Sequence, residues 1–107
     1  MRFISAATLV STMALVSSAY AADATLVIKD HKFEPAELTV PANEKITLTV
    51  KNEDSTPAEF ESHDLKREKV IKGGKSAVIK LGPLKAGEYK FVEEFHEATA
   101  KGVLIAK

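Results

Sequence analysis

Hydrophobic and polar residues alternate along several short stretches of this 107-residue chain. In the clearest stretch, residues 46–50, Ile46, Leu48 and Val50 alternate with two threonines. Successive side chains of a β-strand point to opposite faces of a sheet, so this pattern predicts a strand with one buried and one solvated face. Comparable runs predict further strands at 25–29, 37–40, 59–61, 77–81, 89–95 and 102–106.

Turn-forming residues separate these predicted strands. They include Pro41 and Asn43, a polar loop over 52–57 and the pair Gly73-Gly74. Almost no stretch of the chain has helical periodicity. About seven short strands at this spacing predict an all-β protein, namely a Greek-key antiparallel β-sandwich.

The segment around Tyr89 carries a further feature of such sandwiches. Residues 84–89 resemble the tyrosine corner, in which a tyrosine hydroxyl returns to the backbone a few residues upstream. We therefore expect the Tyr89 hydroxyl to donate a hydrogen bond to a nearby upstream carbonyl.

A carboxylate interrupts the apolar face of the last aromatic strand. Four alternate residues share that face: Tyr89, Phe91, Glu93 and Phe95. Glu93 therefore lies where the pattern predicts core, and burying an ionised carboxylate without a partner costs several kcal/mol. It needs a proton, a cation or a metal ion. Because His96 follows three residues later, where the strand ends, the pair indicates a metal site.

The N-terminus has the pattern of an export signal. A basic start at Arg2 precedes an uncharged, largely apolar run over 3–16 and the sequence Ala-Tyr-Ala at 19–21. We predict that residues 1–21 are a cleaved signal peptide and that 22–107 form a single domain in the periplasm. A retained membrane anchor is the alternative, but the run is shorter than the ~20 apolar residues of a spanning helix and contains serine and threonine.

The composition narrows the possible functions. The chain has no cysteine, so an exported domain of this size is held together by packing rather than by disulfides. It has 15 basic and 15 acidic residues, which predicts a solvated surface and no nucleic-acid-binding patch. It contains no nucleophile-elbow motif, phosphate-binding glycine loop or helical metalloprotease motif. Hydrolase and transferase functions find no support, and metal redox chemistry is the one enzymatic activity left open.

Four motifs have a characteristic spacing: Phe33-x-Pro35, Leu-Thr-Val-Pro-Ala at 38–42, Asn52-x-Asp54, and Gly87-x-Tyr89-x-Phe91 followed by His96 and Gly102. Together they resemble the cupredoxin fold over nearly the whole predicted mature chain. The resemblance implies that the β-sandwich is of cupredoxin type. Blue-copper members of that family bind copper through two histidines, a cysteine and usually a methionine.

The resemblance also locates the corresponding ligand positions. Aligning on Tyr89 and Phe91 places Glu93 at the cysteine position and His96 at the second histidine position. The first histidine position falls at Ala58 or Glu59, and the methionine position falls at Ala100 or Lys101. Without a thiolate the site is not of the blue-copper type. Carboxylate and imidazole ligands suit Cu(II), Fe(II), Fe(III), Mn(II) or Zn(II).

Two segments, residues 58–71 and 94–102, resemble the corresponding segments of the cysteine-free cupredoxin-like proteins of bacterial iron uptake. That group includes the small periplasmic component of Ftr-type ferrous-iron transport systems and, more distantly, the cupredoxin domain of EfeO-type proteins. The resemblance implies a bound copper or iron ion and an accessory role in ferrous-iron uptake. It also implies a partner, either a membrane iron permease or a periplasmic iron-binding protein, that receives the iron.

The candidate metal ligands are Glu93, His96 and Glu59, with Glu61 and His31 as secondary candidates. Glu59 is chosen because a cupredoxin-like site needs a ligand from this loop. If Phe60 points inward, Glu59 points outward unless the chain bulges as it enters the strand. His31 has an alternative interpretation as a solvated loop residue, and His63 is expected to be exposed.

Two other functions remain open on sequence. One is a periplasmic copper-binding or copper-buffering protein without a part in iron transport. The other is a metal-free interaction domain that kept the fold. The aromatic residues are expected to form core in either case: Phe33, Phe60, Phe91 and Phe95.

Overall fold

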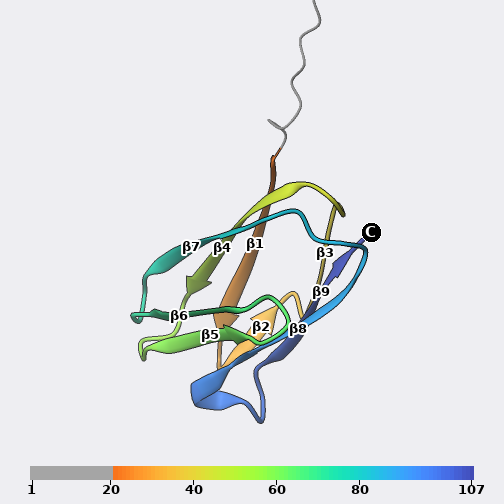
Figure 1. Ribbon diagram of the computed structural model, residues 1–107. Coiled ribbons are helices and arrows are strands. Elements are labelled where there is room, and N and C mark those ends of the chain that lie inside the picture. Colours follow the sequence, from red (N-terminus) through yellow and green to blue (C-terminus); the bar gives the residue numbers. More distant parts are fainter. Residues whose placement is uncertain (1–20) are drawn as a thin grey trace, which may run out of the picture.

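The computed structural model describes residues 21–107 as nine strands and one short 3-10 helix (Figure 1). The strands are β1 (Ala21–Lys29), β2 (Lys32–Glu34), β3 (Glu37–Val40), β4 (Lys45–Asn52), β5 (Ala58–Ser62), β6 (Arg67–Ile71), β7 (Ser76–Leu81), β8 (Gly87–Glu93) and β9 (Lys101–Ala106). The 3-10 helix is η2 (Glu94–His96). The predicted signal peptide, apart from Ala21, lies outside the described residues. No helix within 21–107 is long and apolar enough to cross a membrane.

The strands form two sheets packed face to face, with strand orders β2-β1-β4-β7 and β3-β9-β8-β5-β6. The expected all-β sandwich is confirmed. Two differences from the sequence prediction stand out. The pairs β1/β4 and β3/β9 are parallel, so both sheets are mixed rather than antiparallel throughout. β2 and β6 were not predicted, because β2 has three residues and β6 exposes four of its five, so neither shows a buried alternating face.

The core lies between the two sheets and follows the alternation of the strands. In β4, Ile46, Leu48 and Val50 are almost fully buried, as their pattern predicts. Phe60, Phe91 and Leu104 close the core from the other sheet. Burying a side chain of this size stabilises the fold by about 1.5–3 kcal/mol relative to leaving it exposed.

An aromatic cluster fills one end of this core. The ring of Phe33 meets that of Phe91 edge to face, with centroids 4.8 Å apart, and Phe60 lies 5.4 Å from Phe91. The prediction that Phe95 also belongs to the core is wrong, since its side chain is 51% exposed. β8 ends at Glu93 and the chain turns into η2, so the strand alternation stops before it reaches Phe95.

The predicted tyrosine corner is confirmed. The Tyr89 hydroxyl donates a hydrogen bond of 2.7 Å to the carbonyl of Lys85. This contact ties the start of β8 to the loop that precedes it.

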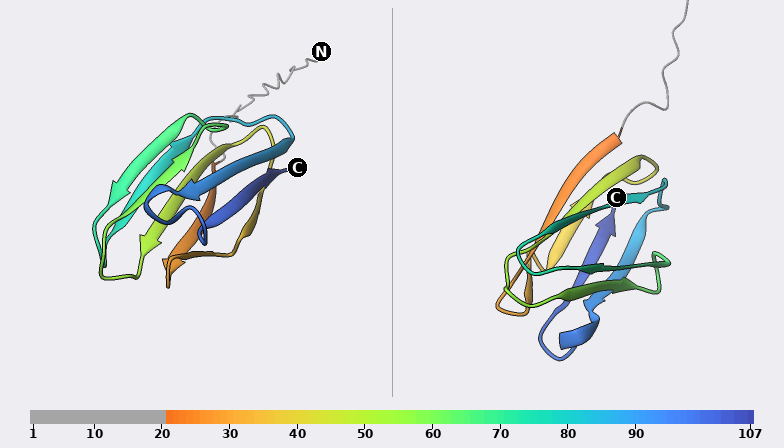
Figure 2. Two further views of the ribbon diagram at one scale, coloured as in Figure 1. Left: turned by 90° about the horizontal axis from the view of Figure 1, so that it is seen from below. Right: turned by 90° about the vertical axis from the view of Figure 1, so that its left-hand side faces the viewer.

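The opposite end of β8 is where the candidate ligands lie. Figure 2 shows the turn between β1 and β2 at the same end of the sandwich as η2 and the loop that leads to β9. A hydrogen bond of 2.8 Å from the Thr99 hydroxyl to the carbonyl of His31 joins these segments. The fold thus brings residues from both sheets to one end.

Gly102 makes a testable contribution to this packing. A Cβ atom at Gly102 would lie 2.5 Å from two ring atoms of Phe91 and 2.9 Å from the carbonyl oxygen of Ala36. Gly102→Ala is therefore expected to lower the free energy of unfolding by about 1–3 kcal/mol through overpacking, measured by urea denaturation. Gly82→Ala is the control, because nothing lies within 4 Å of its Cβ position. Equal urea midpoints for the two variants would contradict this view of the Phe91 packing.

Candidate metal centre

Three side chains of metal-binding type meet at this end of the sandwich. They are His31 in the β1–β2 turn, Glu93 at the end of β8 and His96 in η2. One potential ligand atom from each lies within 4.8 Å of the others. Glu93 and His96 are primary candidates from the sequence, and His31 is a secondary one. The structure brings all three together.

The Glu93 carboxylate is fully buried and is satisfied by groups of the chain itself. Its Oε2 accepts hydrogen bonds of 2.9 Å from the backbone N–H groups of Glu59 and Phe95. Its Oε1 lies 2.5 Å from Nδ1 of His96. Two amide donors therefore hold one oxygen, while the other faces the imidazoles. The two N–H groups are the hydrogen-bond partners that a buried carboxylate requires, and the second oxygen is directed at the histidines.

η2 sets the position of His96. The Glu93 side chain caps the first turn through the N–H of Phe95, and the carbonyl of His96 accepts from the N–H groups of Thr99 and Ala100 at 3.1 and 2.9 Å. A single tight turn thus places His96 three residues after Glu93 on the same side. The imidazole is 34% exposed, so one edge remains accessible.

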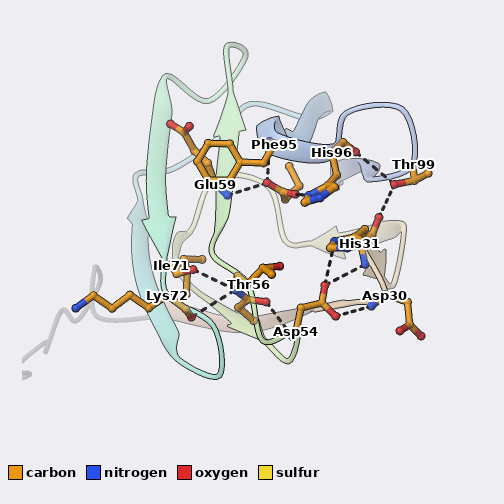
Figure 3. Close-up of polar contacts among 12 residues, drawn as sticks. Asp30, His31, Asp54, Thr56, Glu59, Ile71, Lys72, Phe95, His96 and Thr99 are labelled. Carbon is orange, nitrogen blue, oxygen red and sulfur yellow. Dashed lines mark hydrogen bonds and ion pairs between the residues drawn. The ribbon is translucent and has the colours of Figure 1, made fainter.

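His31 lies against His96 from the other sheet. The two imidazoles stack with centroids 3.7 Å apart and an angle of 17° between their planes, and both are labelled in Figure 3. Because a nitrogen lone pair lies in the ring plane, two nearly parallel rings do not aim at one point. Joint binding of one ion requires one ring to turn, and the 43% exposed His31 has space to do so.

The structure does not bring the carboxylates of Glu59 and Glu61 to this centre. In β5, Ala58, Phe60 and Ser62 are buried, so the two glutamates face outward. Phe60 pairs directly with Glu93 without a bulge between them, which is the register that leaves Glu59 outside. Figure 3 shows the Glu59 side chain pointing away from His96. What Glu59 contributes is its backbone N–H.

The outward glutamates form an acidic face with Glu94. Burial raises the pKa of Glu59, and the negative charge of Glu94 raises it further. For Glu61 the largest cause is a hydrogen bond between its carboxyl group and that of Glu94, which also raises the pKa, followed by burial. His63 lies at the margin of this face, with its side chain 92% exposed and Nε2 3.9 Å from Glu61. The expectation that His63 is exposed is confirmed.

Sequence reasoning missed Asp54 and Thr99, which surround the centre. Asp54 belongs to the Asn52-x-Asp54 motif, one of the four that resemble the cupredoxin fold. Its carboxylate, however, accepts hydrogen bonds from the backbone of Asp30 and His31, 24 and 23 residues away. No local signal in the chain indicates a contact over that separation. Thr99 lies in the last loop without any distinguishing neighbour.

The donor set fits a transition-metal ion. Two imidazoles and one carboxylate, with no cysteine anywhere in the sequence, are ligands for Cu(II), Fe(II), Mn(II) or Zn(II). The buried, amide-held carboxylate keeps one ligand oxygen fixed, as supporting hydrogen bonds do in metal sites. Phe60, paired with Glu93 across the strands, adds an apolar wall.

Comparison with protein families and with curated sequences identifies relatives of this chain. The model of the family described as cupredoxin-like domain matches residues 2–106. An uncharacterized protein of Rickettsia prowazekii is 49% identical over 80 residues, which cover 75% of this chain and 64% of that protein. The chain thus spans less than two thirds of the length of this relative.

Several solved structures share the fold. Auracyanin A, a blue copper protein from Chloroflexus aurantiacus, has a TM-score of 0.70 and 15% identity over 82% of this chain and 100% of its own. A purple cupredoxin from Nitrosopumilus maritimus has a TM-score of 0.61 and 20% identity over 78% of this chain and 99% of its own. Amicyanin from Paracoccus versutus has a TM-score of 0.62 and 19% identity over 83% of both chains. At these identities the similarity establishes the fold.

The acidic face makes a prediction about pH. Glu59 and Glu61 have pKa values raised above the ordinary 4.5, so the folded state holds their protons more tightly than the unfolded state. They therefore lower the stability as the pH rises through and above 4.5. Glu94→Gln is expected to move both pKa values down toward 4.5, measured by NMR titration of the side-chain carboxyl carbons.

The same variant should gain stability over the parent at pH 7 and lose that gain at pH 3, where Glu59 and Glu61 are protonated and no longer repel a charge at position 94. Glu97→Gln removes an equal charge just after η2 and serves as control, since Glu97 is not a cause of either shift. A gain that is the same at both pH values would contradict the charge repulsion described here.

Proposed function

Since the chain belongs to the family of cupredoxin-like domain proteins, we propose that it binds a transition-metal ion, copper or iron, through Glu93, His96 and His31. We further propose that it is an exported, periplasmic accessory of ferrous-iron uptake. The observation that carries the metal site is the fully buried Glu93 carboxylate, one oxygen of which faces two imidazoles.

The residues of the centre have distinct tasks. Glu93 supplies a negative charge whose position is set by the N–H groups of Glu59 and Phe95. His96 and His31 supply neutral nitrogen ligands from two different sheets, so a bound ion would also join the two layers. A copper ion bound there would supply one-electron redox chemistry, with Cu(II) accepting an electron from Fe(II) to give Cu(I) and Fe(III).

The iron-uptake role rests on the resemblance of residues 58–71 and 94–102 to the small component of Ftr-type systems and to EfeO-type domains. The acidic face of Glu59, Glu61 and Glu94 is consistent with it, because clustered carboxylates raise the local concentration of cations such as Fe(II). A membrane iron permease or a periplasmic iron-binding protein would then take up the iron that this protein oxidises or hands over.

A second candidate function is copper binding or buffering without a part in iron transport. It is favoured by the imidazole content of the centre and by the copper proteins among the structures that share the fold. A metal-free interaction domain is the third possibility. These functions differ in what the protein does with added metal, so metal titration separates them.

Metal binding is tested by calorimetric titration of the metal-stripped protein with Cu(II) and, anaerobically, with Fe(II). Glu93→Gln and His96→Ala are each expected to weaken binding more than about 100-fold, beyond the 10–100-fold typical of residues that only support ligands. Glu59→Gln is the matched control, because it removes a nearby carboxylate and keeps the backbone N–H that Glu93 uses.

Unchanged affinity in Glu59→Gln with loss in the other two variants supports the centre described here. Loss in Glu59→Gln alone would move the site to the outer face of β5. If neither ion binds the parent protein, the metal-free interaction domain becomes the better explanation.

Ferrous-iron oxidation is tested by mixing Cu(II)-loaded protein anaerobically with Fe(II) and following Fe(II) with a colorimetric chelator. The iron-uptake proposal expects Fe(II) to disappear in proportion to the loaded copper, and His96→Ala to abolish that loss. Copper that binds tightly but leaves Fe(II) unchanged would favour the copper-buffering function.

A further inference from the structure

His31 lies in a two-residue turn in which neither residue is glycine. Asp30 has φ of 52° and His31 has φ of 58°, both in the left-handed region. Two-residue hairpin turns with this backbone usually contain glycine, asparagine or aspartate. Aspartate and histidine adopt a left-handed backbone more often than most residues, but the Cβ contact in that conformation still costs free energy. A contact that pairs with the backbone N–H groups of the turn would offset this cost.

The Asp54 carboxylate supplies that contact. Its Oδ1 accepts a hydrogen bond of 2.7 Å from the N–H of Asp30, and its Oδ2 accepts one of 3.0 Å from the N–H of His31. Figure 3 shows Asp54 directed at the backbone of both residues. One side chain thus fixes both residues of the turn from another loop of the protein.

Asp54 is in turn held by the core. Its own N–H donates to Oδ1 of Asn52 at 3.0 Å, and its carbonyl accepts from the N–H of Gly74 at 3.0 Å. Asn52 is buried, and its amide donates to the carbonyls of Thr56 and Ile71 at 2.8 and 3.1 Å. The position of the Asp54 carboxylate is therefore set by the ends of β4 and β6.

Asp54 also contacts the imidazole ring. Its Oδ2 lies 3.4 Å from Nδ1 of His31. A carboxylate beside one ring nitrogen favours the tautomer that carries the hydrogen there, which leaves the lone pair on the other nitrogen free for a metal ion. On the opposite side of the turn, the Thr99 hydroxyl holds the carbonyl of His31.

We propose that Asp54 is a positioning residue of the metal centre. It holds the backbone of His31 in a left-handed turn beside His96 and keeps hydrogen on Nδ1, so that Nε2 is the ligand atom when the ring turns out of the stack. The metal part of this inference rests on the proposed function. The turn and the tautomer do not, since they belong to the metal-free protein.

A purely structural role is the alternative, in which Asp54 only stabilises the hairpin. The two roles differ in one respect. A structural residue affects metal binding equally whether or not His31 is present, whereas a positioning residue acts through His31. A double-mutant cycle between Asp54 and His31 separates them.

The experiment uses the full chain with four variants: Asp54→Ala, Asp54→Asn, His31→Ala and the double variant Asp54→Ala/His31→Ala. Glu53→Gln is the control, because it removes the same charge from the neighbouring, exposed position of the loop. The tautomer of His31 is measured in the metal-free protein by long-range proton–nitrogen NMR of the ring. The Cu(II) affinity is measured by competition with a chelator, and nitrogen ligation is measured by EPR.

The parent and Glu53→Gln are expected to show a single Nδ1–H tautomer of His31, and Asp54→Ala a mixture. Asp54→Ala should weaken Cu(II) binding about 10–100-fold and reduce the nitrogen signal in EPR. It should have no further effect in the His31→Ala background. Asp54→Asn keeps an acceptor for the turn without the charge, so it carries the test if Asp54→Ala does not fold.

An unchanged tautomer in a folded Asp54 variant overturns the proposal. So does an equal loss of Cu(II) affinity with and without His31. If the parent protein binds no Cu(II), the proposed function fails, and the NMR comparison still decides whether Asp54 positions His31.

Discussion

The buried carboxylate of Glu93 is the constraint around which this end of the protein is arranged. An ionised carboxylate in the core costs several kcal/mol unless donors surround it. The chain supplies them from two directions, the N–H of Glu59 across the sheet and the N–H of Phe95 just beyond the strand. The first requires Phe60 to pair with Glu93, and the second requires β8 to end at Glu93 and turn into η2. The register between β5 and β8 and the point where β8 ends are therefore both needed to bury the candidate ligand Glu93 with its hydrogen bonds made.

This arrangement also decides what the surface presents. With Phe60 facing inward opposite Glu93, the neighbouring Glu59 and Glu61 must face outward, where they meet Glu94. Burial raises the pKa of Glu59, a hydrogen bond with Glu94 raises the pKa of Glu61, and the negative charge of Glu94 raises both further. The turn into η2 likewise leaves Phe95 half exposed beside the centre. An acidic and partly apolar rim thus follows from the burial of a single residue.

The centre itself is assembled from segments that are far apart in the chain. Glu93 and His96 come from one sheet and its adjoining turn, whereas His31 comes from the other sheet. The hydrogen bond from Thr99 to His31 joins the two segments, and Asp54 holds the His31 turn from the loop after β4. A metal ion bound by all three side chains would join the two layers at their open end. Binding and stability would therefore be linked, because ligands held in place by the fold also hold the fold together.

Alternation and turn residues predicted the sandwich and the buried faces of its longer strands, and the motif at residues 84–89 predicted the tyrosine corner, since each is a local pattern. It also located Glu93 in the core and His96 beside it, because three residues separate them in the sequence. The outward direction of Glu59, the stacking of His31 and the role of Asp54 were decided only by the tertiary structure. Each depends on contacts across 23 or more residues. The direction of Glu59 also depends on the pairing of Phe60 with Glu93, because a shift of strand register by one residue reverses which side chains face the core.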